Sequence, residues 1–198
     1  MKRFFRLFVA AVCVSILFPL AAEAQFGHTT NVGRTFGGAN VGTTNLDSGL
    51  KFGVDVDNLA MRGYYDADGY SGDESTEYYY AWEVLANVGY QFNPHLYCGL
   101  SIGGGSTPSD MDDPRFIAAV ALRSYLSQGK TAPMVSLNVG YMNYFGDDST
   151  VYASPGVGVR FGLGERSGIS VQFVAVMDML YYKDDGGLGF GLRLGYDF

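Results

Sequence analysis

The sequence is poor in the residues from which metal clusters and disulfide frameworks are built. It contains two cysteines, two histidines and one tryptophan in 198 residues. Once the first 24 residues are set aside, as argued below, Cys98 is the only cysteine, so neither an internal disulfide nor a cysteine metal cluster is expected. Beyond those first residues, no stretch is apolar enough to form a membrane-spanning helix. The sequence therefore predicts no metal, no cofactor and no helical anchor.

Basic residues are also scarce. The chain has 13 Lys and Arg against 20 Asp and Glu, a net charge of −7. Removing residues 1–24 takes away three basic residues and one acidic residue, which leaves a net charge of −9. An acidic surface repels phosphate backbones. We therefore expect no nucleic acid among the partners of this chain.

The first 24 residues have the pattern of a secretory signal peptide. A basic start at 1–6 precedes an almost wholly apolar run at 7–20, and Ala22-Glu23-Ala24 supplies the small residues that a signal peptidase reads. The rival interpretation is a membrane-spanning helix. It is weaker, because the run is shorter than the roughly 20 residues needed and is interrupted by Pro19. We expect an exported chain that starts at Gln25 and has the length of one domain.

What the sequence has in abundance is glycine, tyrosine and phenylalanine, placed in alternation. There are 28 Gly, 15 Tyr and 14 Phe residues. The clearest segment is 188–198, where one set of alternate positions is Leu188, Phe190, Leu192, Leu194, Tyr196 and Phe198. The other set is Gly189, Gly191, Arg193, Gly195 and Asp197. Successive side chains of a strand point to opposite faces, so this segment predicts a strand with one oily face and one small or charged face.

The same alternation recurs seven more times along the chain. The other expected strands are 50–56, 80–92, 96–103, 116–123, 135–141, 156–163 and 169–178. Short turns at 93–94, 128–132 and 164–167 alternate with acidic links at 58–77, 104–115, 146–150 and 183–186. An even number of strands, with short turns at one end and loops at the other, is typical of outer-membrane barrels. The expected fold class is all-β, an eight-stranded antiparallel up-and-down transmembrane β-barrel over residues 49–198.

Residues 25–48 show no clear alternation, and we expect an irregular N-terminal segment there. A further strand near 35–41 would raise the count above eight. Pro155 stands at the edge of the expected strand run 156–163, where it cannot donate to the ladder, so we expect a bulge or a late strand start.

Alternation by itself leaves the orientation of the oily face open. A soluble barrel of lipocalin type puts it inside around a ligand, and a membrane barrel puts it outside against lipid. The non-oily face is dominated by small residues, which suit the crowded interior of eight strands. The charged residues on that face could pair within the lumen: Lys51, Glu83, Arg123, Arg160, Asp178 and Arg193. Aromatic residues gather near both ends of the strands, as two membrane interfaces require. Both features favour the oily face outside, with Cys98 on it.

The signal peptide, the eight alternating strands and the terminal residues 194–198 (Leu-Gly-Tyr-Asp-Phe) resemble small outer-membrane β-barrels of the OmpA/OmpX type. The resemblance implies a place in the outer membrane of a Gram-negative bacterium, in contact with lipid and lipopolysaccharide. It also implies that Tyr196 and Phe198 resemble the C-terminal signal read by the barrel-assembly machinery.

Candidate catalytic and metal-binding residues are few. The only histidines, His28 and His95, fall in the irregular segment and at a short turn, away from any expected convergence of a nucleophile and an acid. Residues 66–77 loosely resemble a calcium loop, but Ser71 stands where such a loop needs glycine. The sequence predicts no enzyme and no wide pore, and a structural or surface-interaction role. The alternatives are a soluble exported lipocalin-like barrel that binds an apolar ligand and a barrel enzyme that modifies lipid A.

Overall fold

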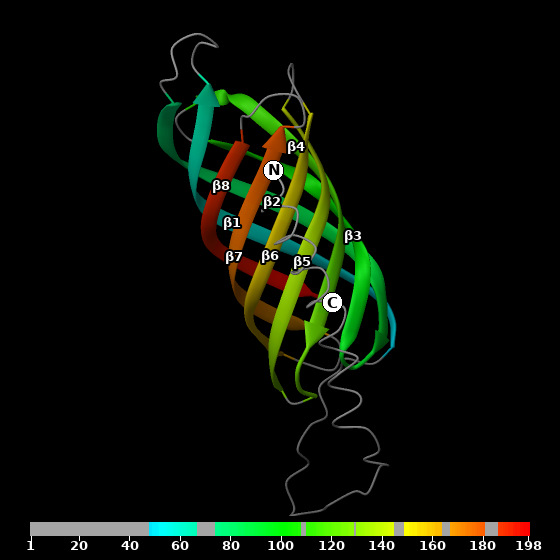
Figure 1. Cartoon of the computed structure of the whole chain (residues 1–198). Helices are drawn as coiled ribbons and strands as arrows, with labels where there is room; N and C mark the ends of the chain where they lie inside the picture. Colours follow the sequence, from blue (N-terminus) through cyan, green and yellow to red (C-terminus); the bar gives the residue numbers. More distant parts are fainter. Residues whose placement is uncertain are drawn as a thin grey trace, which may run out of the picture.

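The computed structural model of the chain describes residues 48–66, 74–107, 110–128, 130–144, 149–163, 167–180 and 186–198. At 63–66, 74–77, 107, 110–113, 144, 149, 178–180 and 186 it describes the backbone only. The described residues form one barrel whose strands wrap around a common axis (Figure 1). Residues 1–47, with the expected signal peptide and almost all of the irregular segment, lie outside the described residues.

Eight strands make up the barrel. They are β1 (Gly49–Asp66), β2 (Glu74–Asn93), β3 (Leu96–Thr107), β4 (Asp110–Tyr125), β5 (Thr131–Tyr144), β6 (Ser149–Gly162), β7 (Gly168–Leu180) and β8 (Gly186–Asp197). Each strand pairs antiparallel with its neighbours in sequence, and β1 pairs with β8 to close the barrel. The predicted eight-stranded up-and-down barrel is confirmed. We name the end where β2 meets β3 the turn-side end, and the end where β1 leads to β2 the loop-side end.

Two of the expected links are shorter than the sequence predicted. β1 continues to Asp66 and β2 begins at Glu74, within the region assigned to the link 58–77. β3 runs to Thr107 and β4 begins at Asp110, within the link 104–115. In β1 the cause is a reversal of the pattern, since Leu59 and Met61 are buried while Asn58 and Ala60 are exposed. From Leu59 onward the apolar residues face inward, so the alternation of the preceding residues stops in the sequence although the strand continues.

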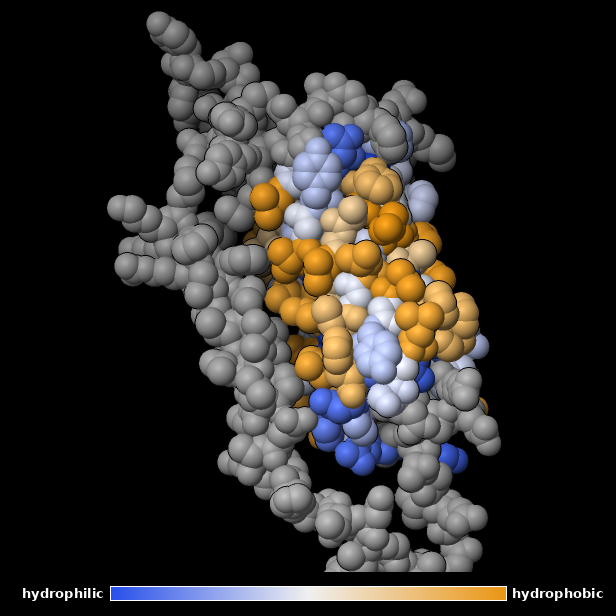
Figure 2. Space-filling view, turned by 90° about the vertical axis from the view of Figure 1, so that its right-hand side faces the viewer, coloured by the Kyte–Doolittle hydropathy of each residue, from blue (hydrophilic) through white to orange (hydrophobic). Residues whose placement is uncertain are grey.

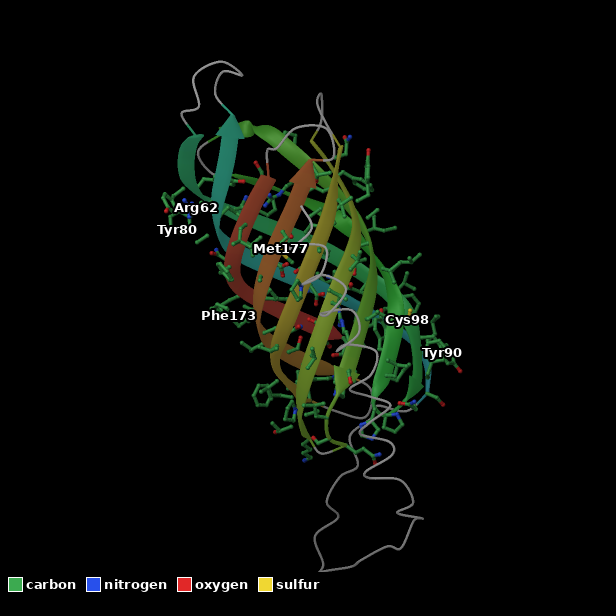
Figure 3. The ribbon with its side chains drawn as sticks, viewed as in Figure 1. Arg62, Tyr80, Tyr90, Cys98, Phe173 and Met177 are labelled. Carbon is green, nitrogen blue, oxygen red and sulfur yellow. The ribbon has the colours of Figure 1, made fainter. Side chains whose placement is uncertain are left out.

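The outer wall of the barrel is apolar. The large hydrophobic side chains that the sequence assigned to the oily faces are exposed, among them Leu50, Phe52, Val54, Val84, Val120, Val157, Phe173, Leu192 and Leu194. Figure 2 shows a band of apolar side chains on one face, bordered at both ends by hydrophilic residues. Cys98 lies on the same outer face, half-buried and in register with Tyr90 (Figure 3). The interpretation in which the oily face encloses a ligand is therefore wrong for these strands.

The aromatic residues divide between the wall and the lumen. Tyr78, Tyr80 and Trp82 are exposed toward the loop-side end of β2, and Tyr90 and Phe92 toward its turn-side end. Two other aromatic residues near strand ends, Tyr97 and Tyr152, are instead buried in the lumen. Both side chains point inward because successive residues of a strand face opposite sides, and each of these tyrosines is next to an outward-facing residue.

Pro155 interrupts one ladder without shifting it. β6 begins at Ser149, well before the proline, so the expected late strand start is wrong. Ala153 pairs with Met177 and Gly156 with Val174, which is one continuous register between β6 and β7. Between Thr150 and Gly162, Ser154 and Pro155 are the two residues without partners on that side, as expected around a residue that has no amide hydrogen to donate.

Candidate functional site

The inward faces of the strands bring a set of charged side chains together in the barrel lumen. Four ion pairs lie among the described residues, and all eight side chains are buried or nearly so. They are Asp57–Arg193, Asp55–Arg123, Glu83–Arg115 and Asp197–Arg160. A buried charge is tolerated only when a partner compensates it, so each pair constrains two strands at once.

The pair Asp57–Arg193 fastens the first strand to the last. Arg193 Nε and Nη2 donate to the two carboxylate oxygens of Asp57 at 2.7 and 2.6 Å, a bidentate arrangement. The two residues are direct partners in the ladder that closes the barrel. Arg193 Nη2 also donates to Ser154 Oγ at 2.9 Å, so the arginine links the β1–β8 pairing to β6 through the lumen.

The pair Asp55–Arg123 crosses the lumen rather than following a ladder. Arg123 Nη2 of β4 donates to Asp55 Oδ2 of β1 at 2.7 Å, although β1 and β4 are not neighbours. The Arg123 guanidinium also lies over the ring of Tyr97, 5.3 Å from its centroid. A cation held between a carboxylate and an aromatic face is fixed in position. This contact fills the lumen toward the turn-side end.

The pair Asp197–Arg160 lies near the turn-side mouth of the barrel. Arg160 Nε is 3.0 Å from Asp197 Oδ1, and Arg160 Nη2 is 2.6 Å from Oδ2. Gly168 makes room for this guanidinium, because a Cβ there would stand 2.5 Å from the Arg160 Cζ. Any larger residue at position 168 would displace the arginine.

The pair Glu83–Arg115 lies further toward the loop-side end. The Arg115 Nη2 is 3.2 Å from Glu83 Oε1, and Tyr152 of β6 donates its hydroxyl to Glu83 Oε2 at 3.1 Å. Three non-adjacent strands therefore meet at one carboxylate, in an interior that is closed to solvent.

Around this point the lumen is filled by apolar side chains, which we name the apolar cluster. Its members are buried and come from β1, β2, β4, β5, β6 and β7: Leu59, Met61, Ala81, Leu85, Ile117, Ala119, Met142, Tyr152, Val174 and Val176. The cavity at the turn-side end is small, about 10 Å³, and is lined by residues that include Lys51, Tyr125 and Asp197. That volume is about enough for one water molecule.

The structure places the residues of the expected lumen network as follows. Glu83, Arg123, Arg160 and Arg193 face the lumen and are buried. Lys51 is half-buried and lines the small turn-side cavity. Asp178 is in β7, in register with Tyr152, and its side chain lies outside the described residues.

Each of the four buried residues pairs with one that the expected network left out. The missing partners are Arg115, Asp55, Asp197 and Asp57. Three of them could have been predicted to face inward, because Asp55 and Asp57 fall on the same alternate positions as Lys51, and Asp197 on the same as Arg193. Arg115 carried none, because it was assigned to a link.

Tyr196 and Phe198 lie on the outer wall at the turn-side end, and both are exposed. Their rings are 6.0 Å apart, and the Phe198 ring stacks on Phe52 of β1 at 6.1 Å. The backbones of Phe52 and Phe198 exchange two hydrogen bonds, at 3.3 and 3.0 Å. The chain end is thus fastened to the first strand.

Of the two histidines, only His95 lies among the described residues, and its hydrogen-bond partners are Asn93, Tyr125 and Gln128. His95 is in the turn between β2 and β3, where its Nδ1 is 2.7 Å from the Tyr125 carbonyl oxygen and its amide donates to Asn93 Oδ1 at 2.8 Å. His28 lies outside the described residues, as do the side chains of the calcium-like segment 66–77. Within the described part of the chain, no group of three potential metal ligands comes together. No helix among the described residues is long and apolar enough to cross a membrane.

Comparison with known proteins gives neighbours in structure only. No protein-family model and no curated protein matches the chain. The N-terminal β-barrel domain of Pseudomonas aeruginosa OprF is similar, with 15% identity over 79% of this chain and 100% of that chain and a TM-score of 0.44. Neisserial surface protein A shares 11% identity over 75% of this chain and 97% of its own, with a TM-score of 0.48. Outer membrane protein OprG of Pseudomonas aeruginosa shares 11% identity over 78% of this chain and 99% of its own, with a TM-score of 0.45. The likeness to these small barrels is one of fold alone.

Proposed function

We propose that this chain is an outer-membrane β-barrel with a structural or surface-interaction role, without a wide pore and without catalytic activity. The observation that carries the proposal is the apolar outer wall. Large hydrophobic side chains on all eight strands are exposed, whereas the charged side chains described on the inward faces are paired or half-buried. Such a wall in water is a strong driving force for association, and lipid satisfies it.

The height of the wall supports a membrane as the surrounding medium. On β2, the exposed residues Tyr78 and Tyr90 mark the two aromatic ends of the outer face and are twelve residues apart in the sequence. At ~3.3 Å per residue and a strand tilt of ~40°, this spacing is about 30 Å along the barrel axis, close to the hydrocarbon thickness of a bilayer. Aromatic side chains prefer the two interfaces of a membrane.

The filled lumen supports a role other than bulk transport. The apolar cluster and the four ion pairs occupy the interior from both sides of the barrel centre. The expected partners are outer-membrane lipid and lipopolysaccharide on the wall, and no nucleic acid. A lipid-A-modifying activity is the less favoured alternative, because His95 is engaged with backbone and side-chain groups of the turn.

Fractionation tests the membrane assignment. The full chain, expressed with its N-terminal segment, should sediment with outer membranes, require detergent for extraction and migrate faster on a gel before heating than after. In planar bilayers the purified protein should give no stable porin-sized conductance. A chain that stays in aqueous solution without detergent would overturn the membrane proposal, and a large steady conductance would overturn the filled lumen.

The C-terminal aromatics give a separate test of assembly. We expect Phe198→Ala to lower the yield of heat-modifiable barrel in the outer membrane several-fold, because the residue would be read by the assembly machinery and fastens the closing strand. The matched control is Phe161→Ala, another exposed aromatic on the turn-side half of the wall. Equal yields for the two variants would remove Tyr196 and Phe198 from the proposed assembly signal.

A further inference from the structure

The described side chains of the outer wall carry very little charge. Among the strand residues whose side chains the structure describes, Arg62 of β1 is the only charged one that faces outward. Its direction follows from the register, since it pairs with Tyr78 of β2, which is 76% exposed, and with Leu188 of β8. Directly paired residues of neighbouring strands share a face. A single cation among the described outward side chains of a largely apolar wall calls for a functional explanation.

The position of Arg62 along the wall is the first part of that explanation. Because Arg62 and Tyr78 are register partners, both lie at the loop-side aromatic end of the wall, about 30 Å from Tyr90 by the strand geometry given above. Leu50, the register partner of Tyr90, is likewise twelve residues before Arg62. If the apolar wall spans the hydrocarbon core, the guanidinium lies at the depth of the lipid headgroups.

The chemistry around Arg62 is the second part. Its guanidinium lies over the ring of Tyr78, 5.7 Å from the centroid, so the aromatic face fixes its position. Tyr80, two residues further along β2 on the same face and 70% exposed, lies beside it outside the ribbon (Figure 3). The N–H donors of a guanidinium lie in its own plane, and their fork matches the oxygens of a phosphate. Tyrosine hydroxyls add donors at the same level.

We propose that Arg62, with Tyr78 and Tyr80, forms a binding site on the barrel wall for the anionic phosphate of a lipid headgroup in the loop-side leaflet. This inference rests on the proposed membrane function. The acyl chains of such a lipid would run down the wall toward Trp82, which is outward on β2 and in register with Asn58, four residues before Arg62. A free phosphate ion would lack this second, apolar contact.

The chain supplies its own reporter for the test, because Trp82 is its only tryptophan. The full chain is reconstituted in phosphatidylcholine vesicles that contain brominated phosphatidic acid or, in the parallel arm, brominated phosphatidylcholine. Quenching of Trp82 then gives the relative affinity of the wall for the two lipids. We expect a preference of roughly fivefold for phosphatidic acid, the effect of about one basic side chain near an anionic headgroup. High salt should weaken the preference.

Variants locate the effect. Arg62→Gln should abolish the preference, and Arg62→Lys should keep part of it, because the charge remains while the fork is lost. The matched control is Lys130→Gln, which removes an exposed cation from the turn between β4 and β5 and should leave the preference unchanged. Folding of each variant is checked by heat-dependent gel mobility.

The outcomes separate the two proposals. Equal quenching by both lipids in an inserted wild-type barrel would overturn the lipid site and leave the membrane function standing. A preference that survives Arg62→Gln, or that inorganic phosphate in solution removes, would overturn it as well. A chain that does not enter the vesicles would instead overturn the membrane function on which the site depends.

Discussion

The two halves of the lumen fill the same cylinder with different chemistry. Toward the loop-side end the interior is the apolar cluster, with residues such as Leu59, Met61 and Val176 fully or almost fully buried. Toward the turn-side end it holds the pairs Asp57–Arg193, Asp55–Arg123 and Asp197–Arg160, which we name the paired region, beside a smaller group of buried apolar side chains that includes Tyr125 and Met134. Both exclude a wide channel, but the paired region depends on three ion pairs, whereas the loop-side half holds one, Glu83–Arg115, among apolar side chains. The apolar cluster depends on volume.

This difference predicts how each half responds to substitution. An apolar interior loses stability in proportion to the volume removed and can repack in part. A buried ion pair that loses one member leaves an uncompensated charge, which cannot be relieved by repacking. The paired region should therefore be the more sensitive half, and its sensitivity should disappear when both partners are replaced together.

The largest effect is expected for Asp57→Asn. The substitution keeps the shape of the side chain but leaves Arg193 buried without its carboxylate, which should lower the free energy of unfolding by about 3–5 kcal/mol. A urea titration of the protein in detergent micelles measures the change. The double variant Asp57→Leu with Arg193→Met should recover most of the loss, since it removes both charges. A single variant as stable as the wild type would break the comparison.

A smaller effect is expected for Leu59→Ala in the apolar cluster. Leu59 is fully buried and faces Gly191 of β8 in register, so its direct partner on that strand has no side chain to fill the space. We expect a loss of about 2–5 kcal/mol, measured by the same titration. The control is Leu192→Ala on the outer wall, where detergent or lipid refills the volume and the loss should be much smaller. Equal losses for the two variants would contradict the assignment of the inner and outer faces.

The same contrast explains which parts of the fold could be predicted from the sequence. The paired region lies where the inward residues are charged or small and the outward residues are oily, so alternation marks both faces. Strand β8 is the clearest case, with Leu192 and Leu194 outward and Arg193 inward, as predicted. In β1 the pattern ends at Asp57, because the next inward residue, Leu59, belongs to the apolar cluster. Beyond Asp57 the inward residues are apolar as well, so the sequence indicates a link where the strand continues.

The pairing of the charges lay beyond the sequence for a different reason. Parity identifies which charges face inward, and it identified Glu83, Arg123, Arg160 and Arg193. Which of them meet depends on strand stagger and on the curvature of the closed barrel. Arg123 reaches Asp55 across the lumen between strands that are not neighbours. The spacing of residues in the sequence does not predict such a contact.

The smallest effect is expected at Tyr152, where the two halves join. Its ring belongs to the apolar cluster, and its hydroxyl donates to Glu83 Oε2 at 3.1 Å. Tyr152→Phe keeps the ring and removes the donor, while Glu83 retains its ion pair with Arg115. We expect a loss of about 1–2 kcal/mol in the urea titration, and a larger one for Tyr152→Leu, which also removes ring volume. If Tyr152→Phe were as damaging as Asp57→Asn, the hydroxyl would be essential to the Glu83 pair, and the boundary between the two halves would lie deeper in the apolar cluster.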